Sequence, residues 1–164
     1  MAAQDVADDP DALASGEEPR WLNAEQLAAW VSFIAVVERL PGVLDAQLQR
    51  DAGLSHYEYW VLAMLSEAPD RTLRMSALAG TTNATLPRLS HVVSRLEKRG
   101  YVRREPCPLD RRATNAVLTD EGWEKIVASA PGHVAEVRRA VFDALDARDV
   151  ADLGRVMSRI LPRL

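Results

Sequence analysis

The stretch from Met75 to Gly122 constrains the fold more than any other part of the chain. Residues 76–80 predict a short helix, and Thr85 predicts the N-cap of a second helix that ends at Gly100. Apolar side chains recur along this second helix at spacings of three and four, as one buried face requires: Leu86, Leu89, Val92, Val93 and Leu96. The opposite face is basic, so the segment predicts a helix that packs on a core and presents positive charge outward.

A basic hairpin pattern follows the second helix. Residues 101–105 and 114–118 predict paired strands, and the segment 106–113 between them is too long for a tight turn. This segment therefore predicts a projecting wing, and Thr119 predicts the N-cap of the next helix. Two helices and a basic hairpin in this order are typical of a winged helix-turn-helix. That module places one helix in the major groove of DNA and a loop beside or in the minor groove.

The segments on the N-terminal side of this module predict two further helices. Asn23 and Gln26 form a capping-box pattern before an apolar repeat that extends to about residue 51. Pro41 should kink or interrupt that helix. Ser55 and Glu58 form a second capping-box pattern, which predicts the start of a shorter helix.

The segments on the C-terminal side predict a long helix that bends at Pro131 and a final helix capped by Asp146. The predicted fold class is therefore mainly α with a small β-wing. The predicted organisation is a disordered acidic tail over residues 1–20 and one domain over residues 21–164, with the winged helix-turn-helix lobe over about residues 54–120 and dimerisation helices over about residues 23–52 and 119–164.

Charge is distributed unevenly along the chain. The net charge is −4, yet residues 71–112 carry ten Lys or Arg residues against three acidic residues. A DNA-binding surface needs a local positive potential and not a basic protein as a whole. A charged run is equally compatible with a solvated surface, so the surrounding helix and hairpin pattern is what favours DNA.

Several other classes of protein fit the sequence poorly. No apolar run approaches the roughly 18 residues that span a bilayer, and the acidic N-terminus is unlike a secretory signal. The single cysteine, Cys107, excludes an internal disulfide, so we expect a cytoplasmic protein without a membrane partner. Three histidines and one cysteine lack metal-ligand spacing, and neither a GxSxG nor a Gly-rich phosphate motif occurs. We therefore expect no enzyme activity, no metal and no cofactor.

The motifs of the lobe and their spacing resemble the MarR family of bacterial transcription regulators. The matching residues are Leu78 and Ala79, LEKRGYV over Leu96–Val102, Asp110 with Arg112, and LTDEG over Leu118–Gly122. The resemblance extends over about residues 23–164. It implies a homodimer that binds double-stranded DNA at a pseudo-palindromic operator, acts as a repressor of a neighbouring promoter and is released by a small aromatic or phenolic ligand. A winged helix used only for protein contacts, without DNA binding, would carry a neutral or acidic recognition face.

The predicted DNA contacts come from the second helix and the wing. Arg88 and His91 lie in the first two turns and are the best candidates for reading bases, because arginine can donate two hydrogen bonds to guanine. Asp110 can brace Arg112 through an ion pair, and family members insert the matching arginine into the minor groove; the same pair could instead only stabilise the hairpin. The other basic residues suit phosphate contacts. The predicted set is Thr85, Arg88, Ser90, His91, Arg95, Lys98, Arg103, Arg104, Asp110, Arg111 and Arg112.

The resemblance also implies a ligand site where the dimerisation helices join the lobe. The candidate residues are aromatic or histidine: Trp30, Phe33, His56, Tyr59, Trp60, Trp123 and His133. Core and dimer packing accounts for each of them at least as well. Cys107 offers a redox-responsive regulator as an alternative, because nearby arginines favour a reactive thiolate, although an incidental exposed thiol is the simpler interpretation.

Overall fold

The structure, a computed structural model, describes residues 19–108 and 110–164, without the side chain of Arg111. The predicted acidic tail lies outside the described residues apart from Pro19 and Arg20. The chain divides into two units, residues 1–37 and residues 38–164, and the predicted domain boundaries stay a prediction. The helices and strands are α1 (Ala24–Ala52), α2 (His56–Glu67), β1 (Thr72–Arg74), α3 (Met75–Thr81), α4 (Leu86–Lys98), β2 (Val102–Cys107), β3 (Asp110–Leu118), α5 (Asp120–Ala140) and α6 (Ala147–Ile160).

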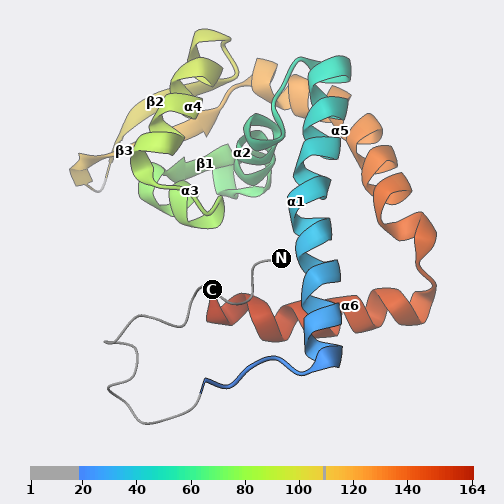
Figure 1. Ribbon diagram of the computed structural model, residues 1–164. Coiled ribbons are helices and arrows are strands. Elements are labelled where there is room, and N and C mark those ends of the chain that lie inside the picture. The colour runs from blue at the N-terminus through green and yellow to red at the C-terminus, as the bar shows by residue number, and fades with distance from the viewer. Residues whose placement is uncertain (1–18, 109) are drawn as a thin grey trace. The chain divides into compact units, whose positions relative to one another are not determined.

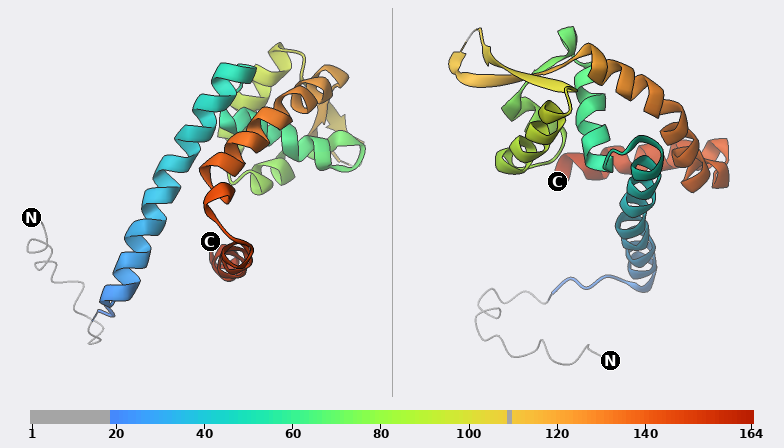
Figure 2. Two further views of the ribbon diagram at one scale, coloured as in Figure 1. Left: turned by 90° about the vertical axis from the view of Figure 1, so that its right-hand side faces the viewer. Right: turned by 90° about the horizontal axis from the view of Figure 1, so that it is seen from above.

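Helices α2, α3 and α4 pack with a three-stranded antiparallel sheet of order β1-β3-β2 to form a compact lobe (Figure 1). Its fully enclosed side chains come from every one of these helices and from the sheet: Leu54, Val61, Leu62, Leu65, Leu78, Leu89, Val93, Leu96, Val102 and Ala116. The β2–β3 hairpin projects beyond the helices of the lobe (Figure 2, right). The predicted mainly α fold with a small β-wing is confirmed.

Local capping signals begin most of the helices where the sequence predicts. Ser55 and Glu58 form a capping box at α2, and Asp146 begins α6 through a capping box with Asp149. Thr85 and Thr119 accept hydrogen bonds from backbone N–H groups in the first turns of α4 and α5. These side chains satisfy N–H groups that have no partner within the helix.

Two details of the predicted helices are wrong. The interruption predicted as one possibility at Pro41 does not occur: α1 continues through Pro41, because proline removes only one hydrogen bond from a helix of 29 residues. Leu86, predicted on the buried face of α4, is 49% exposed. It is the first residue of α4 and lies ahead of the turns that pack on the core.

The hairpin is longer than the sequence predicts. Pairing continues past Glu105 to Pro106↔Thr114 and Cys107↔Asp110, with an irregular register between Pro106 and Cys107. The predicted end of the first strand at Glu105 and start of the second strand at Thr114 are therefore wrong, because part of the predicted wing segment is paired. Strand β2 lies at the edge of the sheet, where a proline without an N–H can be accommodated.

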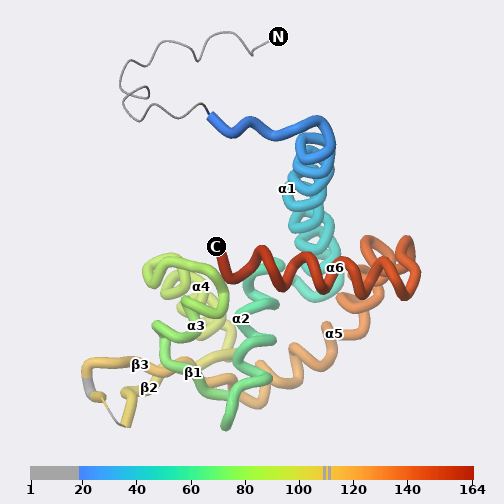
Figure 3. The backbone as a smooth tube through the Cα atoms, turned by 90° about the horizontal axis from the view of Figure 1, so that it is seen from below, coloured from blue at the N-terminus to red at the C-terminus, as the bar shows by residue number. Residues whose placement is uncertain are grey.

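Helix α5 leads from the end of β3 away from the lobe to α6 (Figure 3). Large apolar side chains on both helices are exposed, including Val127 and Val134 on α5 and Leu153 and Ile160 on α6. Within the described residues, none of those in α6 is buried. Ile126 on α5 joins the core of the lobe, but the exposed apolar side chains of α5 and α6 lack an apolar partner among the described residues.

Helix α1 is long and apolar enough, by length and composition alone, to cross a membrane. The expectation of no apolar run near 18 residues concerned uninterrupted runs, and α1 meets the membrane-length limit only with charged residues inside it. Glu38 and Arg39 interrupt its apolar sequence, and apolar helices of this kind also occur in the cores and subunit contacts of proteins outside membranes.

Candidate nucleic-acid interface

Helix α4 has one buried face and one exposed basic face. Leu89, Val92, Val93 and Leu96 are buried. The predicted contacts Thr85, Arg88, His91, Arg95 and Lys98 are all exposed, and Ser90 is half-buried. His91 and Ser90 also line a shallow hollow of about 310 Å³ along the helix, together with Pro87 and Ser94.

Arg88 has a partner that the sequence did not reveal. Its guanidinium carbon lies 4.8 Å from the ring centroid of Tyr57 on α2, within the range of a cation–π contact. The Tyr57 hydroxyl is 2.9 Å from Oγ1 of Thr82, in the turn before α4. Tyr57 therefore links α2 to that turn and packs against Arg88, which the sequence predicts to contact a base.

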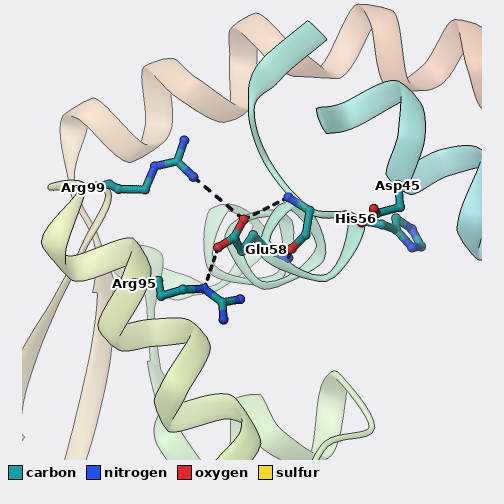
Figure 4. Close-up of polar contacts among 6 residues, drawn as sticks. Asp45, His56, Glu58, Arg95 and Arg99 are labelled. Carbon is teal, nitrogen blue, oxygen red and sulfur yellow. Dashed lines mark hydrogen bonds and ion pairs between the residues drawn. The ribbon is translucent and has the colours of Figure 1, made fainter. Parts of the chain in front are cut away.

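Arg95 and Arg99 converge on one buried carboxylate (Figure 4). Nε of Arg95 donates to Oε1 of Glu58 at 3.1 Å, and Nη1 of Arg99 lies 3.8 Å from Oε2. Burial raises the pKa of Glu58, but the Ser55 backbone N–H and the Arg95 guanidinium outweigh it and hold the pKa below its ordinary value. Arg95, predicted to contact DNA, thus has a strong partner within the protein.

The two adjacent arginines of β2 differ in their surroundings. Nη2 of Arg104 donates to the carbonyl oxygen of Ser90 at 2.7 Å and to Oγ of Ser94 at 3.0 Å, so this side chain ties the hairpin to α4. Arg103 is more exposed and pairs with Glu105 on the same strand. The sequence predicts phosphate contacts for both arginines, but the geometry gives Arg104 a bracing role inside the lobe.

Asp110 and Arg112 interact in a different way from the predicted ion pair. Oδ1 of Asp110 accepts the backbone N–H of Arg112 at 3.0 Å, while Oδ2 lies 3.8 Å from Nη1 of Arg74 on β1. The predicted side-chain brace is wrong in form, because the carboxylate orients the backbone of Arg112 and pairs with a different arginine. The side chain of Arg111, also predicted at this site, lies outside the described residues.

Arg74 connects the wing to the rest of the interface. It lines a hollow of about 530 Å³ between α4 and the wing, together with Arg104 and Arg112. Its Nη2 donates to Sγ of Cys107 at 3.4 Å. Cys107 is buried, so the interpretation of an incidental exposed thiol is wrong. The hydrogen-bonded register of the hairpin carries Cys107 inward.

The structure brings together three of the seven predicted ligand-site residues. The ring centroid of His133 on α5 lies 4.3 Å from that of Tyr59 and 5.9 Å from that of His56. Both of these residues are on α2. Nδ1 of His133 is buried and has no hydrogen-bond partner among the described residues. Trp60 packs edge-on against Tyr57, Trp123 lies under Arg71, and Trp30 and Phe33 form a pair within residues 1–37.

The two histidines predict a pH-dependent stability. Burial lowers the pKa of both side chains below 6.5, and the neighbouring His56 lowers that of His133 further. In the window below pH 6.5 the unfolded chain therefore binds more protons than the folded one. The contribution of these two histidines to the free energy of unfolding should be complete above pH 6.5. It should decrease as the pH falls below 6.5.

Urea unfolding between pH 8 and pH 5 measures this effect. His133→Gln should flatten the dependence, because it removes one of the two histidines whose pKa burial lowers. Glu58, whose pKa is also lowered, contributes only at more acidic pH, below its ordinary value of 4.5. An unfolding free energy that stays constant from pH 8 to pH 5 would contradict the prediction.

A helix-turn-helix whose second helix is basic, with an arginine-rich hairpin beside it, defines a winged-helix DNA-binding protein. A sequence model of the MarR family matches residues 52–113. The chain is 50% identical to Sco3205, a MarR family transcriptional regulator from Streptomyces coelicolor solved in complex with DNA, with a TM-score of 0.86 over 90% of this chain and 92% of that one.

Two curated bacterial regulators are also similar. The HTH-type transcriptional regulator PrsX of Escherichia coli is 36% identical over 116 residues, 65% of this chain and 70% of its own length. The HTH-type transcriptional repressor YetL of Bacillus subtilis (strain 168) is 25% identical over 116 residues, 71% of this chain and 69% of its own length. The chain belongs to the MarR family of DNA-binding transcriptional regulators, which are not enzymes.

Proposed function

We propose that this protein is a homodimeric, sequence-specific repressor of a neighbouring promoter, acting in the cytoplasm. The observation that carries the proposal is the exposure of Arg88 and His91 on the first two turns of α4, beside a basic hairpin. Residues at this end of a recognition helix reach base edges in the major groove. The similarity to a regulator solved with DNA and to a named repressor supports the same reading.

Dimerisation follows from apolar surface that the chain leaves exposed. The side chains concerned include Val127, Val134, Leu153 and Ile160 on α5 and α6. Exposed apolar faces of this extent are typical of subunit contacts, and a twofold dimer would match a pseudo-palindromic operator with half-sites about one helical turn apart. Light scattering at micromolar concentration tests this: a monomer would refute it.

Selection of bound duplexes from a random library tests sequence-specific recognition. Arg88→Ala should relax the base preference at one position of the selected motif, because it removes a base contact. The lost discrimination between bases should be about 1–3 kcal/mol. Lys98→Ala should weaken binding to all sequences alike, because Lys98 suits a phosphate contact. The slope of log affinity against log salt concentration should become shallower by about one. A selection with wild-type protein that enriches no motif would contradict the proposal.

Regulation by a small aromatic or phenolic ligand is the second part of the proposal. The unpartnered Nδ1 of His133, packed against Tyr59 at the α2–α5 contact, supports a polar aromatic ligand there. A phenolic acid that binds should weaken operator binding, and His133→Phe should remove that response. Oxidation at Cys107 is the alternative, supported by the adjacent Arg74 and opposed by burial of the thiol.

One titration separates the two modes of regulation. Cys107→Ser should abolish release of DNA by peroxide while leaving release by an aromatic ligand intact. If neither a panel of phenolic acids nor peroxide changes the operator affinity of the wild-type protein, both modes are refuted.

A further inference from the structure

We propose that Glu58 is a positioning residue for DNA recognition: it sets the orientation of α4 through Arg95 and Arg99, and these two arginines are thereby held away from DNA. The inference rests on the proposed sequence-specific recognition by α4. It assigns a role to a buried acidic residue outside the recognition helix, and it removes Arg95 from the set of DNA contacts.

The carboxylate of Glu58 is enclosed and fully engaged. Its side chain is only 9% exposed, and its Oε2 accepts the backbone N–H of Ser55 at 2.9 Å, which fixes the carboxylate at the start of α2. Its Oε1 accepts Nε of Arg95 at 3.1 Å. A buried charge in this position needs a cation, because an unpaired buried carboxylate is strongly unfavourable.

The two arginines act on the same side of α4. Arg95 and Arg99 are four residues apart, so they lie on one face, and both meet the same carboxylate (Figure 4). Arg99 is further confined by the ring of Tyr101, 4.9 Å from its guanidinium carbon. Arg104 holds α4 separately through Ser90 and Ser94. Together, Glu58 and Arg104 restrict rotation of the helix about its axis.

Rotation of α4 matters because base reading depends on geometry. Arg88 lies seven residues before Arg95, about 10 Å along the same rigid helix. Productive contacts require side chains to be held to within about 0.5 Å and 10–20°. Releasing the anchored end of the helix should therefore impair reading of bases. Contacts to phosphates should persist, because they depend on net charge more than on exact placement.

The start of α2 is itself anchored. Oδ1 of Asp45, in the part of α1 that belongs to residues 38–164, accepts the backbone N–H of His56 at 2.8 Å (Figure 4). Glu58 is two residues further along. The Asp45–His56 hydrogen bond thus ties the first turn of α2, which carries Glu58, to α1.

The test compares affinity for the selected operator with affinity for a scrambled duplex, using the full chain. Glu58→Gln keeps a residue that suits a capping box and removes the charge. Arg95→Gln breaks the same contact from the arginine. Because the Arg95 side chain is 58% exposed, this variant tests the inference even if Glu58→Gln does not fold. Lys98→Gln, an exposed cation on the same helix, is the matched control.

Glu58→Gln and Arg95→Gln should each lower the ratio of specific to non-specific affinity about tenfold, and the double variant should be no worse than either single one. Lys98→Gln should lower both affinities alike, keep the ratio and make the salt dependence shallower by about one charge. Arg95→Gln should leave that salt dependence unchanged.

Two results would overturn the inference. One is a ratio of specific to non-specific affinity that equals that of the wild type in both Glu58→Gln and Arg95→Gln. The other is an Arg95→Gln protein that behaves like Lys98→Gln, which would make Arg95 a phosphate contact. A wild-type protein that does not distinguish operator from scrambled DNA would overturn the proposed function, and this inference with it.

Discussion

Replacing Gly122 with alanine is expected to lower the free energy of unfolding by about 3 kcal/mol. A Cβ atom at this position would lie 2.1 Å from the backbone oxygen of Tyr101 and 2.7 Å from Cδ1 of Leu118. The Tyr101 carbonyl cannot easily move, because it accepts the backbone N–H of Thr119 at 3.1 Å. The first turn of α5 would have to separate from the hairpin to make room.

Urea unfolding of the purified protein measures this loss. Gly80→Ala is the matched control, because Gly80 lies in α3 and a Cβ there meets nothing within 4 Å. That substitution should be neutral or slightly stabilising, since alanine favours a helix over glycine. Equal stability of the Gly122 and Gly80 variants would show that the start of α5 can shift, and that the close contact with Tyr101 does not constrain the fold.

Replacing Arg104 with glutamine is expected to lower the free energy of unfolding by about 2 kcal/mol, while Arg103→Gln should change it by less than about 0.5 kcal/mol. Arg104 is 28% exposed at its side chain and donates to two residues of α4, so its removal loses both of these hydrogen bonds. Arg103 is 53% exposed and pairs only with Glu105 among the described contacts.

The same two variants separate bracing from phosphate contact on DNA. Arg104→Gln should weaken operator binding more than scrambled binding, because α4 and the hairpin lose their connection. Arg103→Gln should weaken both duplexes to the same degree, as loss of a phosphate contact does. Two variants with the same stability and the same binding profile would show that both arginines serve the DNA backbone alone.

The sequence predicted the elements of this fold well because their signals are local. Thr85, Thr119 and Asp146 begin their helices by bonding to N–H groups two or three residues ahead, and such contacts can be read from a few neighbouring positions. The spacing of apolar residues likewise identified the buried face of α4, apart from its first residue. The order of motifs in the lobe then indicated the family, which the comparisons confirmed.

The partners of charged side chains could not be predicted in the same way. Arg95 and Lys98 look alike on a helical projection, yet only Arg95 meets a carboxylate, and that carboxylate comes from a residue 37 positions earlier. Asp110 similarly pairs with Arg74, on a strand remote in sequence. Which arginine faces DNA is a property of the packing of α2, the sheet and α4, and no local pattern records it.

The position of β2 at the margin of the sheet has a consequence for solubility. An open strand edge offers unpaired N–H and C=O groups to which another chain can add, and two wings on a dimer would double that exposure. Pro106 has no N–H to donate, and the charged residues Arg103 and Glu105 lie on the same strand. The hairpin can therefore project from the lobe without its outer strand becoming a template for aggregation.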